Sequence, residues 1–175
     1  MTDPFQTSLV SKKGDAGGQI AANDASLQFI TFALAEQEYG VDIMAVREIK
    51  GWTATTPIPN APSCIYGVIN LRGIIVPIMD LRARFGLPSR PPDKMNVVII
   101  ITIGARTIGL LVDAVSDIIA LAPEAIKPIP EIGLTAQDNL LTGLASHNER
   151  MVSLVSLDCL LNADLTATAI GGIAA

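Results

Sequence analysis

The sequence predicts an all-β protein of two small five-stranded β-barrels packed together, with short helices and a flexible N-terminal tail. Runs of five to eight residues rich in Val, Ile and Thr are separated by Gly and Pro, which is typical of short strands. Half of the 175 residues are hydrophobic and 17% are charged, so there is enough apolar material for a core. The chain also contains an internal repeat. Strands that close into a barrel remove the exposed edges of an open sheet.

The repeat keeps the same order of glycines, prolines and strands in both copies. QFITFALAEQEYGVDIMAVREI at 28–49 aligns with VVIIITIGARTIGLLVDAVSDI at 97–118, which places Gly40 on Gly109. Three later pairs follow in the same order: PIP at 57–59 with PIP at 128–130, Gly67 with Gly143, and VPIMDL at 76–81 with VSLVSL at 152–157. This order indicates two copies of one β unit. We therefore expect barrel 1 at about 26–90 plus C-terminal elements, and barrel 2 at about 94–155.

Each element of the first unit has a local signal. The opening strands and the third strand are expected at Gln28–Leu34, Tyr39–Ile43 and Arg47–Trp52, and a hairpin at 66–79 supplies the last two. Asp80 is placed to N-cap the helical turn DLRARF, which Gly86 and Pro88 end. Residues 1–25 and 163–175 are rich in small residues without periodicity, so both are expected to be flexible.

The hairpin turn raises a question of its own. Gly73 suits a tight turn because glycine takes positive φ without a steric penalty, but Arg72 beside it is neither small nor a usual turn residue. Either Arg72 only solvates the hairpin tip or it is held out for a partner. A second ambiguity concerns Val46 and Glu48, which alternation places on one face of a strand. That face is either core with an edge charge or a small binding surface.

Several classes of function have little support. A net charge of −5 and a pI of about 4.7 argue against nucleic acid as the main partner. The longest apolar run, Val97–Ile103, is too short to span a membrane, and no signal peptide is recognisable. The only histidine, His147, lies in a polar turn, and no phosphate loop, metal spacing or nucleophile–base pair is present. We therefore expect no enzyme activity, cofactor or metal, although an active site in a groove between the barrels stays an alternative.

Four stretches together resemble one known family. EYGVDIMAVREIKG, PIPNAPSCIYGVINLRGIIVPIMDLRARFG, GARTIGLLVDAVSDI and TGLASHNERMVSLVSLDCLL are similar to the CheW-like domain family, over about 26–162. The resemblance implies two five-stranded SH3-like barrels around a shared core. It also implies a non-catalytic bacterial chemotaxis adaptor, cytoplasmic and recruited to membrane-associated receptor arrays. Such an adaptor couples the cytoplasmic tip of a transmembrane chemoreceptor, a helical hairpin, to the regulatory domain of the histidine kinase CheA.

The resemblance also implies site residues. Receptor contact is expected at positions Ile43, Val46, Glu48, Ile49, Gly67 and Arg72. Kinase contact is expected through barrel-to-barrel packing that includes Val97, Val98, Ile99 and Ile100, because alternation would put two of these four residues on an outer face. Two alternatives remain. An SH3-like barrel could bind RNA, which would need a basic stripe and more than the 4% of aromatics present. A CheW-like coupler could also serve a non-flagellar chemosensory system.

Overall fold

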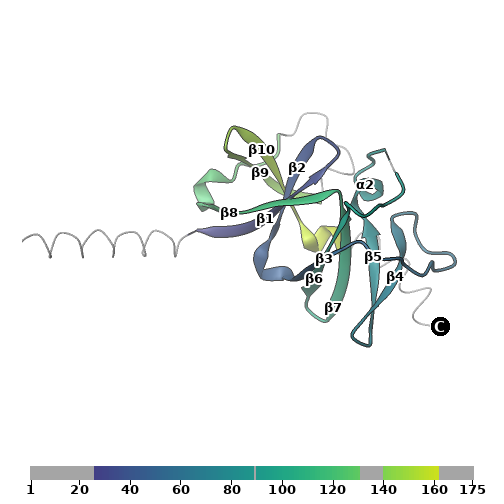
Figure 1. Cartoon of the computed structure of the whole chain (residues 1–175). Helices are drawn as coiled ribbons and strands as arrows, with labels where there is room; N and C mark the ends of the chain where they lie inside the picture. The colour runs from purple at the N-terminus through teal and green to yellow at the C-terminus, as the bar shows by residue number, and fades with distance from the viewer. Residues whose placement is uncertain (1–25, 89, 131–139, 162–175) are drawn as a thin grey trace, which may run out of the picture.

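The computed structural model describes residues 26–88, 90–130 and 140–161 as two five-stranded sheets joined by short helical turns (Figure 1). Sheet A has the order β8 (Ala114–Leu121), β1 (Leu27–Leu34), β2 (Gln37–Asp42), β10 (Arg150–Val155) and β9 (Leu141–His147). Sheet B has the order β3 (Val46–Gly51), β6 (Val97–Ile103), β7 (Arg106–Val112), β5 (Ile74–Asp80) and β4 (Ile65–Leu71). The short helices include η1 (Ile43–Ala45), α2 (Leu81–Arg84) and η2 (Pro123–Ala125), and residues 157–161 are also helical. The predicted all-β fold with two five-stranded units and short helices is confirmed.

Each sheet contains strands of both repeats, so neither sheet coincides with a barrel expected at about 26–90 plus C-terminal elements or at about 94–155. Sheet A combines the opening hairpin β1–β2 with β8, β9 and β10 from the second repeat, and sheet B combines β6–β7 with β3, β4 and β5 from the first. The connections explain this exchange. Only Asp113 separates β7 from β8, too short a link for a hairpin, so the chain continues into the other sheet. The three residues of η1 carry the chain from sheet A into β3 in the same way.

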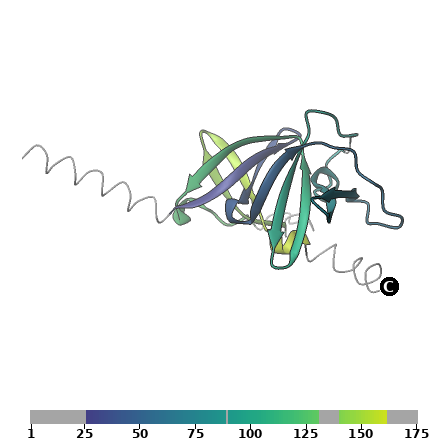
Figure 2. The same ribbon diagram turned by 60° about the horizontal axis from the view of Figure 1, so that its bottom comes forward.

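The internal repeat is confirmed by the pairing pattern. Both sheets contain one parallel pair, β2 with β10 and β5 with β7, between strands of different repeats. The aligned glycines occupy equivalent places in these pairs, since Gly40 lies opposite Leu154 and Gly109 opposite Ile78. The two repeats therefore contribute equivalent strands to the two sheets, which lie side by side in Figure 1 and Figure 2.

Three apolar cores hold the sheets. The largest lies between them and includes Phe32 of sheet A and Ile101 of sheet B, both fully buried. A second core, around Val76 and Ile100, is built from sheet B, and a third, around Leu154, from sheet A. The shared core implied by the family resemblance is thus present, and each sheet has a further core of its own.

Sheet B curls so that its two edges approach one another. Thr56, which follows edge strand β3 along the chain, forms an antiparallel bridge with Val68 on the opposite edge strand β4. Lys127 and Leu144 form the equivalent bridge in sheet A. In both sheets the segment after the third strand of a repeat covers the far edge, which protects backbone groups that would otherwise be unpaired.

Candidate functional site

The turn between β4 and β5 holds Arg72 in an unusual conformation. Leu71 pairs with Ile74, so Arg72 and Gly73 form a two-residue turn with φ angles of 53° and 88°. Positive φ at both positions is the type I′ geometry, which matches the twist of the flanking strands and favours Asn-Gly. The Asn70 side chain accepts a hydrogen bond from the Gly73 N–H at 2.8 Å. Arginine therefore occupies a left-handed position that asparagine or glycine fits more easily.

The guanidinium of Arg72 reaches the other edge of sheet B. Its Nη2 donates a 2.8 Å hydrogen bond to Oε2 of Glu48 on β3. The Arg72 side chain is 73% exposed, whereas that of Glu48 is 26% exposed. Most donors of the guanidinium therefore still face solvent, held in a fixed direction by one carboxylate. This arrangement favours the second answer to the question of the turn, that Arg72 is held out for a partner.

Exposed apolar residues lie close to Glu48 along the chain. Ile49 on β3 is 43% exposed and Met44 in η1 is 87% exposed. Ile43 and Val46 are half-buried and pack against the shared core. A β-bulge between Val46 and Glu48 shifts the register against β6, so Val46 is support for this surface more than an exposed contact. We call Met44, Glu48, Ile49 and Arg72 the hairpin–β3 surface.

Gly67, one of the predicted receptor contacts, lies inside the protein. A Cβ at this position would lie 2.7 Å from the backbone oxygen of Thr56. At the aligned Gly143 a Cβ would lie 2.8 Å from the backbone oxygen of Lys127. The two glycines therefore allow β4 and β9 to approach the segments that contain Thr56 and Lys127. Close packing thus explains why glycine recurs at these aligned positions.

The expectation that two residues of the 97–100 run face outward is wrong. Val98, Ile99 and Ile100 are 2%, 0% and 0% exposed, and Val97 is half-buried. Strand β6 lies between β3 and β7 within sheet B, with Ile99 in the shared core and Val98 and Ile100 in the sheet B core. A continuous apolar run thus indicates a strand buried on both faces, and these side chains are not available to a partner.

A groove opens between the two sheets next to η1. It is a hollow of about 320 Å³ that continues into one of about 210 Å³, and the two share Ile103 and Asp158. Phe29 of β1, Ala45 of η1 and Leu157 also line it. Since Ala45 directly precedes β3, the groove and the hairpin–β3 surface are joined through η1. No local sequence pattern marks Phe29 or Ile103 as a site residue, because the two line one groove only in the folded chain.

The internal repeat gives the groove a counterpart elsewhere in the protein. At this counterpart a cluster of charged side chains takes the place of an open groove. Arg82 of α2 donates to both carboxylate oxygens of Asp113, with Nε at 2.8 Å from Oδ1. The same carboxylate accepts the Ala35 N–H at 2.8 Å, and Arg82 also donates to the Pro88 carbonyl at 2.9 Å. Arg90 lies 3.9 Å away. The alignment that places Leu157 on Leu81 puts an aspartate, Asp158, at the position of Arg82, and on that side the groove stays open.

The ionic cluster sets two pKa values in opposite directions. Burial alone would raise the pKa of Asp113, but hydrogen bonds from Arg82 and Ala35 and nearby positive charge outweigh it, so the pKa lies below its usual value. Burial raises the pKa of Asp80, against hydrogen bonds from the backbone of Arg82 and Ala83. Asp80 also accepts the Arg82 N–H at 3.0 Å, which confirms it as the N-cap of α2.

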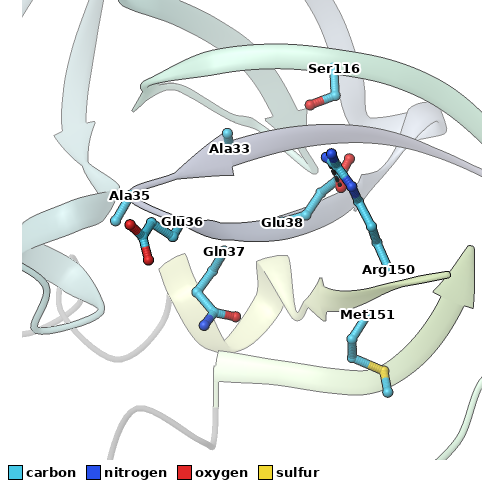
Figure 3. Close-up of a pocket in the computed structure, with 8 residues that line it drawn as sticks. All are labelled: Ala33, Ala35, Glu36, Gln37, Glu38, Ser116, Arg150 and Met151. Atoms are coloured by element: carbon cyan, nitrogen blue, oxygen red, sulfur yellow. Dashed lines mark ion pairs between the residues drawn. The ribbon is translucent and has the colours of Figure 1, made fainter. Parts of the chain in front are cut away.

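A further hollow, of about 500 Å³, lies on sheet A (Figure 3). It is lined by residues of the β1–β2 turn, β8 and the start of β10. Arg150, 78% exposed, points toward Glu38 at 3.7 Å, beyond hydrogen-bond distance, while Glu36 and Gln37 point away from it. Two carboxylates and one loosely held arginine do not form a catalytic or metal-binding arrangement.

The other side chains considered as catalytic or metal-binding candidates lie apart from one another. Over the described residues, no group of three or more His, Cys, Asp or Glu side chains could hold a metal ion. His147 ends β9, with the turn formed by Asn148 and Glu149. Cys64 is buried and Cys159 exposed. Within the ranges that the structure covers, no helix is long and apolar enough to cross a membrane.

Comparison with known proteins points to one family. Residues 28–165 match the family model described as CheW-like domain. The chain is 42% identical over 146 residues to the chemotaxis protein CheW of Klebsiella aerogenes, covering 83% of this chain and 88% of that protein. It is 44% identical over 131 residues to the chemotaxis protein CheW of Rhizobium meliloti, with 75% and 84% covered. The crystal structure of the scaffolding protein TtCheW from Thermoanaerobacter tengcongensis is similar, with a TM-score of 0.71, 36% identity and coverage of 78% of this chain and 88% of that one.

Proposed function

Because the chain belongs to the CheW-like domain family, we propose that it is a non-catalytic chemotaxis adaptor that couples transmembrane chemoreceptors to the histidine kinase CheA. The relatives named as chemotaxis proteins, and a structural neighbour described as a scaffolding protein, support this function. An adaptor needs two binding faces and no reactive group. Its place is the cytoplasmic side of the membrane, in arrays of receptors.

The observation that carries the proposal is the conformation of Arg72. The turn of the aligned hairpin, β9–β10, has Asn148 and Glu149 at φ angles of 50° and 66°. Asparagine suits the first position of a type I′ turn, whereas Glu149 at the second position is itself a non-glycine residue in the left-handed region. At the β4–β5 turn the chain instead places an arginine in the left-handed region and directs it with Glu48. Non-glycine residues in this region concentrate at functional sites, where surrounding structure offsets the strain.

The receptor face consists of the hairpin–β3 surface and the adjoining groove. A receptor tip is a helical hairpin, so it presents a narrow apolar ridge flanked by polar side chains. The ridge packs against Met44, Ile49 and the groove wall at Ala45 and Ile103. Arg72 then fixes the register through its free donors, since a guanidinium recognises a carboxylate or helix C-terminus directionally.

The kinase face requires exposed apolar groups, so the buried run at 97–100 does not provide it. Ile58 and Tyr66 are 42% and 40% exposed, and Trp52 contacts Tyr66 edge-on with ring centroids 5.4 Å apart. The antiparallel bridge between Thr56 and Val68 brings Ile58 toward Tyr66 at the covered edge of sheet B. Aromatic and aliphatic groups of this kind suit packing against another barrel. We assign the kinase regulatory domain to this edge.

The test is a bridging experiment with three purified components: the chain, a receptor-tip hairpin and the regulatory domain of CheA. We expect the tip to retain the kinase domain on a column only when the chain is present. A chain that binds one component but never both at once would contradict the adaptor function. Tyr66→Ala should reduce kinase binding and leave tip binding unchanged, whereas a loss of both with a normal melting curve would contradict separate faces.

A further inference from the structure

The third strand of each repeat has no partner within its own repeat. We define repeat 1 as residues 27–84 and repeat 2 as residues 97–161. Among the described strand pairings, β3 of repeat 1 pairs only with β6, and β8 of repeat 2 pairs only with β1. These two ladders contain five and seven residue pairs. Neither repeat can therefore complete a sheet alone.

The surface between the repeats resembles the interior of a domain. Phe32 and Ile101 are aligned by the internal repeat, and both are 0% exposed in the shared core. Their cross-strand neighbours, Val115 for Phe32 and Val46 for Ile101, are aligned with each other as well. Matched apolar groups on both repeats make this an interface of the obligate kind, self-complementary in the manner of a two-fold dimer.

One covalent link joins the repeats, the connection between α2 and β6. No strand or helix is described within it, and Pro88, Pro91 and Pro92 restrict its backbone. At its far end Asn96 is fixed, donating to the Val112 carbonyl at 3.0 Å and accepting the Trp52 N–H at 3.1 Å. The strand pairings between the repeats are all non-covalent. Repeat 1 of one chain can therefore form the same pairings with repeat 2 of its own chain or with repeat 2 of another copy.

We infer that two copies of this chain can complete one another, repeat 1 of one copy assembling with repeat 2 of the other. Both repeat interfaces are then formed, so the product is a closed dimer whose population rises with protein concentration. In that dimer Ala45 and Leu157 of a groove come from different copies, so two complete grooves are present. This consequence for the grooves rests on the proposed function, but the assembly itself does not.

The test uses two full-length variants that are matched by the internal repeat, Phe32→Asp and Ile101→Asp. Each places an unpaired charge in the shared core of one repeat and leaves the other repeat native, so neither should fold alone. We expect an equimolar mixture, refolded together, to regain cooperative thermal unfolding by circular dichroism. Light scattering should give the mass of two chains, since each copy contributes its native repeat. The readout is independent of receptor and kinase binding.

Each variant refolded alone at the same total concentration is the control. A mixture as unfolded as the controls, a recovered particle with the mass of one chain, or a variant that folds alone would each overturn the proposal. A second full-length protein, with a protease site inserted between Pro91 and Pro92, tests the link directly. We expect its two fragments to remain one particle after cleavage and to melt as the uncut protein does, and their separation would also overturn the proposal.

Discussion

At the scale of single residues, two positions show that the same sequence signal can have different physical causes. Arg72 and Gly67 both stand out from the strand pattern around them. Arg72 is exposed and directed by Glu48, which is a feature of the surface. Gly67 is buried under the backbone oxygen of Thr56, which is a feature of packing. Substitutions at the two positions should therefore affect different measurements.

Replacing Arg72 by asparagine should separate folding from binding. Arg72→Asn creates the favoured Asn-Gly turn and removes only an exposed ion pair, so the free energy of unfolding should change by less than about 1 kcal/mol. Binding of the receptor tip should weaken by about 1–3 kcal/mol, or roughly 5- to 150-fold, in calorimetry. Arg150→Ala, which removes an equally exposed arginine from the aligned hairpin, is the control and should not change binding. Unchanged binding in Arg72→Asn would show that Arg72 has no role at the receptor face.

Replacing Gly67 by alanine should destabilise the fold. The new Cβ would overlap the Thr56 carbonyl, and separating β4 from this segment should cost about 1–3 kcal/mol in urea unfolding. Gly51→Ala in the same sheet is the matched control, because nothing lies within 4 Å of its Cβ position. Equal stability of the two variants would mean that the close approach at Gly67 relaxes without cost.

At the scale of elements, the ionic cluster at Asp113 fastens parts of both sheets. Its carboxylate connects the turn between β1 and β2 through Ala35 with α2 through Arg82. Both side chains of the Arg82–Asp113 pair are nearly buried, at 13% and 12% exposed. Removing one partner would leave the other charge without compensation.

Asp113→Asn should therefore lower the free energy of unfolding by about 2–4 kcal/mol near neutral pH. The folded pKa of Asp113 is depressed, so its contribution is present above the unfolded pKa of about 3.9 and is lost as pH falls through the folded value. Urea unfolding between about pH 6 and pH 3 should show the wild-type and variant stabilities converging on acidification. The pKa of Asp80 is raised, so its contribution to the free energy of unfolding changes with pH in the opposite direction. Asp80 is present in both proteins, so the comparison between them isolates Asp113. Parallel curves would contradict the role of the Asp113 charge.

At the scale of the whole molecule, the shared core should make the two sheets unfold together. The only tryptophan, Trp52, packs against the core of sheet B, whereas Phe32 belongs to sheet A. Phe32→Leu should lower stability by about 1–2 kcal/mol and shift the urea midpoint equally by Trp52 fluorescence and circular dichroism. Leu27 lies in the same strand but is 47% exposed, so Leu27→Ala should shift the urea midpoint much less. A Trp52 midpoint that does not move with Phe32→Leu would show that the sheets unfold separately.

The sequence alone determined the features that depend on neighbouring residues. Alternating Val and Ile runs, the Arg72-Gly73 turn and the Asp80 cap follow from local backbone preferences, and each is found where it was expected. The repeat also followed from the sequence, because both copies of the β unit need glycine at aligned, closely packed positions such as Gly67 and Gly143. The six positions implied for receptor contact and the pathway of the adaptor remain predictions.

Only the tertiary structure decided which strands pair and which faces are covered. An apolar run such as 97–100 is compatible with an exposed face or with two buried ones, and burial on both sides became evident only with cores above and below β6. The exchange of hairpins could not be predicted from the sequence either, because residues such as Leu27 and Leu121 pair although they are far apart along the chain. The contact between Arg72 and Glu48 has the same origin, since it joins opposite edges of one curled sheet. Local preferences fix strands and turns, whereas long-range packing of apolar faces selects their partners.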